Sequence, residues 1–122
     1  MNESGEMYLK DIYFLKSENN KIRSIDIAKR RNVSRAGVSK AVGILKEKAL
    51  ITIDGNGLID ITDEGIKYVL VLIDKCKIIS WFLKENLDID KCVACENACK
   101  YEHVITDDCY LAMKKKYEEM VK

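Results

Sequence analysis

Apolar residues recur every three or four positions along most of the chain, a spacing that predicts amphipathic helices rather than strands. Met7, Ile12 and Leu15 form such a stripe, which predicts a first helix over residues 3–18. Polar residues at positions 18–21 then interrupt the pattern. We therefore expect a loop between this helix and the next apolar segment.

Hydroxyl side chains mark the starts of two further helices, because a serine before a helix commonly accepts a hydrogen bond from its first turn. Ser24 is expected to cap a short helix that ends near Arg31. Ser34 is expected to cap a third helix that continues to about Lys48. These segments predict two helices joined by a tight turn.

The periodicity changes between residues 50 and 61. The runs LITI (residues 50–53) and LIDI (58–61) are rich in β-branched residues, and DGNG separates them. Asp-Gly and Asn-Gly are strong signals for the turn of a β-hairpin. A small hairpin is therefore predicted here.

Helical periodicity returns after the hairpin. Thr62 is expected to cap a long helix that ends near Lys84, with two carboxylates in its first turn. Asp88 is predicted to start a helix that carries a cysteine-rich segment, and Thr106 to start the last helix. The fold class predicted is mainly α with a small hairpin.

Composition narrows the class of protein. The chain has 122 residues, of which 48% are hydrophobic and 34% charged, which suits one domain or two small ones. No apolar run is long enough to span a bilayer, and no signal-peptide pattern is present. A cytoplasmic protein without a membrane role is expected, whose five cysteines are thiols or ligands rather than disulfides.

Charge is distributed unevenly, and its basic part coincides with a recognisable order of elements. Basic residues predominate over residues 21–48, whereas residues 85–108 are mainly acidic. Helix, short helix, turn, helix and hairpin is the order of a winged helix-turn-helix, whose third helix enters the major groove of DNA. Small, hydroxylated and basic side chains gather near the start of that helix. The predicted DNA-contacting residues are Arg23, Ser34, Arg35, Ala36, Gly37, Ser39 and Lys40.

Two neighbouring arginines, Arg30 and Arg31, are expected to contact the phosphate backbone. The alternative is a helical domain whose basic surface has no DNA role.

The segment CVACENACKYEHV, residues 92–104, concentrates side chains that bind metal ions. At 100° per residue, five of them fall within an arc of roughly 100° on a helical wheel. They are Cys92, Cys95, Cys99, Glu102 and His103. Buried cysteines often serve only as small apolar side chains, but glutamate and histidine resist burial unless they are paired or bound to metal. Cys99, Glu102 and His103 are therefore the predicted centre of a metal site.

Several segments carry a resemblance to a known family. They are EMYLKDIY (residues 6–13), IRSIDIA (22–28), ITDEG (61–65) and ACKYEHV (98–104), with Val-Ser pairs at 33–34 and 38–39. In these segments the chain resembles the metal-dependent repressors of the diphtheria toxin repressor and manganese transport regulator family. The resemblance covers nearly the whole chain and implies the short form, without the SH3-like domain of longer members.

The resemblance implies two domains and a set of ligands. Residues 1–61 would form the winged helix-turn-helix, and residues 62–122 a helical metal-binding and dimerisation domain. The implied metal ligands are Met7, Cys76, Cys95, Cys99, Glu102 and His103. Cys76 and Cys95 stand where the family usually has histidines, and could serve a second metal site.

The same comparison suggests which ion is bound. Lys10 replaces a carboxylate ligand of the manganese-type members, and Ser80 stands where an acidic ligand often occurs. Thiolates with one imidazole favour iron(II), zinc or cobalt over manganese. The implied function is a homodimeric repressor, not an enzyme, that binds a DNA operator when activated by a divalent ion, with iron(II) favoured. Trp81, Phe82 and Leu83 are expected at the dimer interface.

Three alternatives stay open. The first is a winged-helix sensor that holds an iron–sulfur cluster, or oxidises its thiols, through Cys92, Cys95 and Cys99. The second is a thiol–disulfide enzyme that uses Cys92 and Cys95, although the chain lacks the usual βαβ context. The third is a zinc-stabilised interaction domain with no DNA role.

Overall fold

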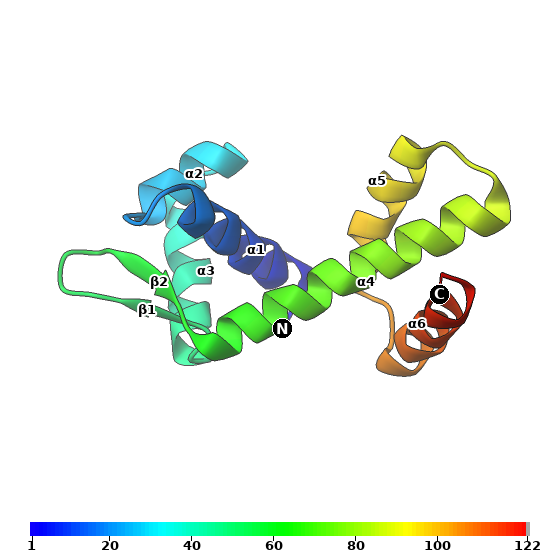
Figure 1. The fold of residues 1–122 in the computed structure, drawn as a ribbon. Coiled ribbons are helices and arrows are strands. Elements are labelled where there is room, and N and C mark those ends of the chain that lie inside the picture. The colour runs from blue at the N-terminus through cyan, green and yellow to red at the C-terminus, as the bar shows by residue number, and fades with distance from the viewer. Residues whose placement is uncertain (122) are drawn as a thin grey trace. The chain divides into compact units, whose positions relative to one another are not determined.

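Residues 1–121 are described by a computed structural model, and they form six helices and one two-stranded antiparallel sheet (Figure 1). In chain order the elements are α1 (Glu3–Glu18), α2 (Ser24–Arg31), α3 (Arg35–Glu47), β1 (Ile51–Ile53), β2 (Ile59–Ile61), α4 (Asp63–Leu87), α5 (Lys91–Tyr101) and α6 (Asp107–Met120). The predicted fold class is confirmed. The chain divides into two compact units, Met1–Val69 and the part from Leu70 onward, and α4 belongs to both.

The helices of the first unit begin largely where capping side chains predict. The Asn2 side chain accepts a hydrogen bond of 2.8 Å from the backbone N–H of Gly5, and the Ser34 hydroxyl accepts one of 3.2 Å from that of Gly37. The prediction that Ser24 caps α2 is wrong. Arg23 occupies the cap position, and its backbone N–H donates a 2.8 Å hydrogen bond to the Asp26 carboxylate. This bond brings Ser24 into the first turn of α2.

The hairpin forms where the Asp-Gly and Asn-Gly signals predict it, and each strand is one residue shorter than expected at its N-terminal end. Ile51 pairs with Ile61 and Ile53 with Ile59. The Asp54 carboxylate organises the turn by accepting hydrogen bonds from the backbone N–H groups at positions 56 and 58, at 2.8 and 2.9 Å. Gly57 has a φ of 79°, a conformation that glycine adopts without steric cost.

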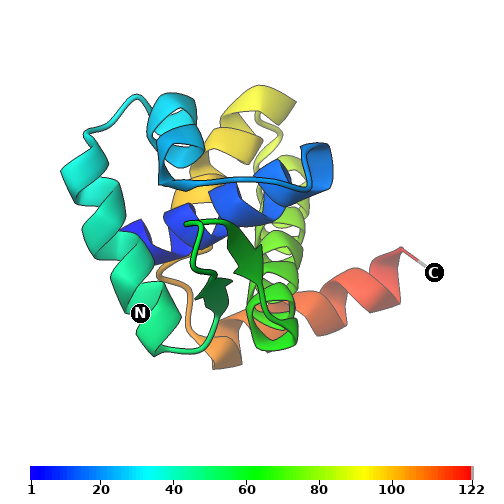
Figure 2. The same cartoon turned by 90° about the vertical axis from the view of Figure 1, so that its left-hand side faces the viewer.

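A single apolar core joins the helices and hairpin of the first unit. The side chains of Leu9, Ile12, Ile27, Val38 and Leu45 have no exposed surface. The N–H of Ile59 donates a 2.9 Å hydrogen bond to the carbonyl of Ile22, which attaches the hairpin to the segment before α2. Figure 2 views this unit from the hairpin side, with α2 and α3 in cyan.

Helix α4 starts against the hairpin. The Thr62 hydroxyl donates to the Ala49 carbonyl at 2.8 Å and accepts from the N–H of Gly65 at 3.1 Å, so one side chain caps α4 and ties it to the chain before β1. A Cβ at Gly65 would lie 2.2 Å from the Leu50 carbonyl oxygen. The close approach of helix and strand therefore requires glycine at this position.

In the second unit, α5 is shorter at both ends than predicted. Asp90, rather than Asp88, caps it by accepting a 2.9 Å hydrogen bond from the N–H of Cys92. Asp88 has a φ of 51°, which is outside the helical region. The helix ends at Tyr101, before the last ligand-type residues of the segment.

Helix α6 packs along α4 through a ring contact and an ion pair. The rings of Trp81 and Tyr117 meet edge to face with centroids 5.1 Å apart. The Tyr110 hydroxyl donates to the Asp74 carboxylate, which also lies 3.1 Å from the Lys114 ammonium. Within the described residues, no helix combines the length and apolar character needed to cross a bilayer.

Candidate metal centre and DNA-binding surface

Three metal-ligand side chains converge between α4 and α5. Cys76 lies on α4, Cys99 on the last turn of α5, and Glu102 at the residue that follows α5. One donor atom from each of the three lies within 4.8 Å of the others, and the two Sγ atoms are 4.0 Å apart. We refer to these three residues as the thiol–carboxylate site.

The three side chains of this site differ in how far they are exposed to solvent. Glu102 is 1% exposed, Cys76 is half-buried and Cys99 is exposed. A carboxylate is rarely taken out of water without strong polar or ionic interactions. The site therefore presents a carboxylate in the interior and a thiol at the surface.

The distances fit a transition-metal ion. A zinc–thiolate bond is about 2.3 Å long, so two thiolates on one tetrahedral ion are about 3.8 Å apart. The observed Sγ–Sγ separation of 4.0 Å is close to this value. Two sulfurs and one carboxylate are a donor set for iron(II), zinc or cobalt rather than for a hard ion such as magnesium or calcium.

Spacing along the chain explains why two of the three residues are close together, and the pairing of two helices explains the third. Cys99 and Glu102 are three residues apart, so they share a face at the end of α5. Cys76 reaches this face because α4 and α5 lie side by side, and one turn further along α4 the Ser80 hydroxyl is 3.5 Å from the Cys95 sulfur. The two helices thus meet through two successive polar pairs, Cys76–Cys99 and Ser80–Cys95.

The other predicted ligands are Cys95, Met7 and His103. Cys95 is exposed and faces Ser80, and Met7 lies on α1 in the first unit. His103 is half-buried and follows the end of α5. The ligand roles of Cys95, Met7 and His103 stay predictions. Cys92 and Cys109 are exposed free thiols.

The predicted DNA-contacting residues are all exposed, on α3 and at the starts of α2 and α3. They are Arg23, Ser34, Arg35, Ala36, Gly37, Ser39 and Lys40. The Arg23 Nε donates a 3.2 Å hydrogen bond to the Asn56 carbonyl, so its side chain reaches the hairpin turn. The start of α2 and the hairpin turn are therefore joined by a basic side chain.

Arg31 and Arg30 pair with carboxylates of α1. Arg31 donates two hydrogen bonds to the buried Asp11 carboxylate, one from Nε at 2.5 Å and one from Nη2 at 3.3 Å. Arg30 lies 3.4 Å from the same carboxylate and 3.7 Å from Glu18. These pairs hold α2 on α1, and the role of the two arginines as phosphate contacts stays a prediction.

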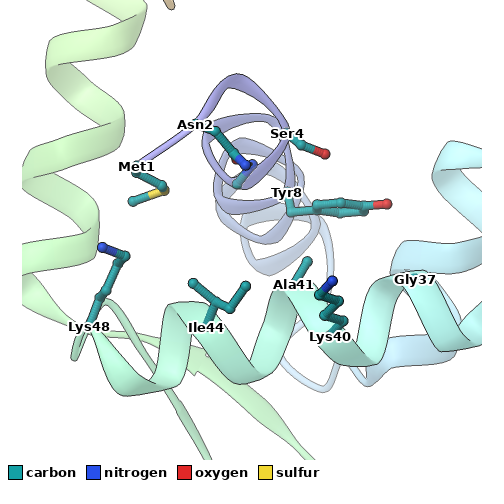
Figure 3. Close-up of a pocket in the computed structure, with 10 residues that line it drawn as sticks. Met1, Asn2, Ser4, Tyr8, Gly37, Lys40, Ala41, Ile44 and Lys48 are labelled. Atoms are coloured by element: carbon teal, nitrogen blue, oxygen red, sulfur yellow. The ribbon is translucent and has the colours of Figure 1, made fainter.

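A pocket of about 450 Å³ opens between the start of α1 and the exposed face of α3 (Figure 3). Met1, Tyr8 and Ile44 supply apolar surface, and Lys40 and Lys48 supply positive charge from α3 and its C-cap. None of the described residues that line it is acidic. The pocket adds a concave basic surface next to the predicted DNA contacts.

Sequence patterns did not indicate one polar link in the first unit. The Tyr68 hydroxyl, on α4, donates a 2.5 Å hydrogen bond to the carboxylate of Glu6, which is 7% exposed on α1. Tyr68 lies in an apolar run, and Glu6 is in the first turn of a helix, where acidic residues are common. The local sequence around each residue therefore does not indicate that the other is its partner.

Comparison with solved structures supports the same architecture. The structure matches ScaR with bound Zn²⁺ with a TM-score of 0.83 and 29% identity, over 93% of this chain and 53% of that chain.

Two sequence relatives match most of the chain. An uncharacterised HTH-type transcriptional regulator of Methanocaldococcus jannaschii is 34% identical over 88% of this chain and 87% of its own length. The diphtheria toxin repressor of Corynebacterium glutamicum is 26% identical over 87% of this chain, which spans only 46% of that repressor.

Family models cover nearly the whole sequence. Residues 1–57 match the iron dependent repressor, N-terminal DNA binding domain, and residues 62–121 match the iron dependent repressor, metal binding and dimerisation domain. These matches do not favour an iron–sulfur or thiol sensor built on the cysteines of α5. They confirm the resemblance carried by the sequence motifs, and the chain belongs to the iron-dependent repressor family.

Proposed function

We propose that the protein is a transcriptional repressor that binds operator DNA when the thiol–carboxylate site holds a divalent transition-metal ion. The convergence of Cys76, Cys99 and Glu102 within 4.8 Å carries this proposal. Met7, Cys95 and His103 are proposed as further ligands, because the family resemblance places them at ligand positions. When bound, the ion would supply a positive charge that holds the thiolates and the carboxylate together.

Iron(II) is the proposed physiological ion, with zinc and cobalt as ions of similar chemistry. Two thiolates and a carboxylate suit these borderline ions better than manganese, which prefers oxygen ligands. The matched domains are described as those of iron dependent repressors. Because such sites generally bind zinc more tightly than iron(II), metal availability in the cell would decide which ion acts.

Helix α4 provides a physical connection between metal binding and DNA binding. It is continuous from Asp63 to Leu87, so it contains both Tyr68, which is bonded to Glu6, and Cys76. We propose that the ion stabilises one arrangement of α4 and α5 and thereby favours the DNA-binding conformation. By linkage, operator DNA must then raise the affinity for the ion by the same factor.

A homodimer is proposed as the active form. The second unit has a wholly apolar pocket of about 340 Å³ whose lining includes Phe82, Leu83 and the strongly exposed Val104. Such a surface is suited to bury against a second copy. Trp81 makes its ring contact with Tyr117 of the same chain, so Phe82 and Leu83 are the more direct candidates for the interface.

Metal-dependent binding to DNA is the direct test. DNA fragments selected by the metal-loaded protein from a random pool would be titrated anaerobically with the protein, by fluorescence anisotropy. Titrations would be run metal-free and with iron(II), zinc(II), cobalt(II) or manganese(II). We expect tight binding only with metal, and weaker activation by manganese than by the other three ions. Equal affinity with and without metal would contradict the proposal.

Two variants sharpen this test. Cys99→Ala is expected to lose metal-dependent binding, whereas Cys92→Ser, which changes an exposed thiol in the first turn of α5, is expected to retain it. Sedimentation of the protein with and without zinc(II) would report the dimer independently of DNA.

A further inference from the structure

The thiols of Cys76 and Cys99 face each other across two helices, with their Sγ atoms 4.0 Å apart, and the two cysteines are not joined in a disulfide. We infer that this pair is a dithiol–disulfide exchange site, which low-molecular-weight disulfides oxidise to an intramolecular Cys76–Cys99 disulfide. The inference concerns the metal-free protein. Its regulatory consequence, given below, rests on the proposed function.

The geometry permits the bond with a small adjustment. A disulfide has a sulfur–sulfur length of about 2.05 Å, so the two Sγ atoms must approach by about 2 Å. Cys99 lies in the last turn of α5, which ends at Tyr101. Helix ends adjust more readily than helix centres, because their last carbonyl groups lack partners within the helix. We therefore expect side-chain rotation and a small movement of this end to close the remaining distance.

Two exchange steps account for the atoms and electrons. The exposed Cys99 loses its proton, and its thiolate attacks one sulfur of a glutathione-type disulfide, which forms a mixed disulfide and releases one small thiolate. The Cys76 thiolate then attacks the Cys99 sulfur and releases the second small thiolate. The two protons lost by the cysteines end on the two released thiols. The protein pair is oxidised by two electrons, and the small disulfide is reduced by the same two.

Positions of the other cysteines make this pair selective. The sulfur of Cys95 lies 3.5 Å from the hydroxyl of Ser80, which cannot form a disulfide. Cys109 is on a different helix, α6. Cys76 is already next to the sulfur it attacks, so the second step is intramolecular and needs no encounter. An initial adduct at Cys99 should therefore resolve faster than an adduct at the other exposed thiols.

Oxidation and metal binding exclude each other, because they use the same two sulfur atoms. Metal ligation requires thiolates, and in a disulfide neither sulfur retains that charge. If the proposed function is correct, a disulfide oxidant would release the repressor from DNA, and a bound ion would protect the pair from oxidation. The site would then respond to the thiol–disulfide balance as well as to metal.

The experiment uses the reduced, metal-free full chain incubated anaerobically with oxidised glutathione. Remaining thiols are blocked with iodoacetamide, and the products are mapped by peptide mass spectrometry. We expect the protein to lose two of its five thiols and to yield one linked peptide pair, Cys76 with Cys99. The Cys76→Ser variant should instead accumulate a stable glutathione adduct at Cys99. The Cys92→Ser variant is the matched control and should form the same disulfide as the wild type.

Other results would overturn the inference. These are the absence of a disulfide while Cys99 reacts with iodoacetamide, a bond between Cys92 and Cys95, or a bond between two chains. Because variants can misfold, the peptide map of the wild-type protein decides the matter.

Zinc(II) separates this inference from the proposed function. At 100 times its Kd, zinc(II) should slow oxidation by about 100-fold, because only the metal-free fraction reacts. Disulfide formation that zinc(II) leaves unchanged would support the thiol pair and contradict the metal site. Failure to bind any operator would contradict the proposed function and leave the disulfide result intact.

Discussion

The hydroxyl of Tyr68 donates a hydrogen bond of 2.5 Å to the buried carboxylate of Glu6, and so fastens the start of α4 to α1. Partial burial and the hydrogen bond to Glu6 together raise the pKa of the Tyr68 hydroxyl well above its ordinary value. The bond therefore needs the protonated phenol. Tyr68 lies on α4, the same helix that carries Cys76.

Removing this hydroxyl should change the alkaline stability of the protein. A folded-state pKa above the unfolded value of about 10 means that the stabilisation is complete below pH 10 and is lost as pH rises further. We expect Tyr68→Phe to be less stable by about 1–3 kcal/mol at pH 7, because buried Glu6 loses a hydrogen bond. Its stability should then decline less than that of the wild type above pH 10. Urea denaturation from pH 7 to 11 measures both effects, with the exposed Tyr101→Phe as control. Superimposable curves for wild type and Tyr68→Phe would refute the assigned role.

The ion pair that attaches α6 to α4 should weaken in acid. Partial burial of Asp74 opposes its ionisation, but hydrogen bonds from Tyr110 and Lys114 outweigh it and lower the pKa of the carboxyl. The stabilisation is therefore present above the unfolded pKa of about 4 and is lost as pH falls through the folded value. Asp74→Asn should lower the melting temperature at pH 7, with a smaller difference at pH 3. Asp107→Asn, which removes an exposed partner 3.5 Å from Lys75, should have little effect at either pH.

Two glycines provide a matched test of the contact between α4 and the hairpin. A Cβ at Gly65 would lie 2.2 Å from a backbone oxygen, whereas one at Gly43, in α3, would meet no atom within 4 Å. Gly65→Ala should destabilise the protein by about 1–3 kcal/mol through overpacking. Gly43→Ala should stabilise it by about 0.4–1 kcal/mol, because it restricts the unfolded chain. Urea denaturation would measure both, and an equal response to the two changes would contradict the described approach of α4 to β1.

Metal affinity should depend on the residues of the thiol–carboxylate site. Cys76→Ser and Glu102→Gln preserve side-chain size but remove a strong ligand. Loss of an outer-shell partner typically lowers metal affinity by about 10–100-fold, so a larger loss is expected here. Cobalt(II) titration followed by thiolate absorbance would measure it, with Cys92→Ser as the unaffected control. Wild-type affinity in both site variants would place the ion elsewhere.

Binding to DNA should show the electrostatic contribution of α3. Arg35 and Lys40 are exposed and basic, and a residue that contacts a phosphate contributes about 0.9 to the slope of log K against log salt. Arg35→Ala and Lys40→Ala should weaken operator binding, and a loss of phosphate contact should reduce the slope by about that amount. Lys67→Ala is the control, because that lysine pairs with Glu64 at the start of α4. Unchanged affinity and slope in both α3 variants would exclude this face from the DNA contact.

The sequence by itself determined the order and type of the elements. Residues that cap a helix or form a turn act on backbone groups only a few positions away, as Ser34 does at α3, Thr62 at α4, Thr106 at α6 and Asp54 in the hairpin. Such contacts are inherent in the local chain. The periodicity of apolar residues likewise identified the buried faces, including Ile12 and Val38.

Only the tertiary structure decided which polar side chains meet. Cys76 and Cys99 are separated by 23 residues, and Arg31 and Asp11 by 20. Each pair depends on how two helices are rotated and aligned against each other, and no local pattern encodes that alignment. The helices and the hairpin could be predicted because their backbone depends on residues nearby in the sequence. The candidate metal centre could not, because its residues come together only when two helices pack against each other.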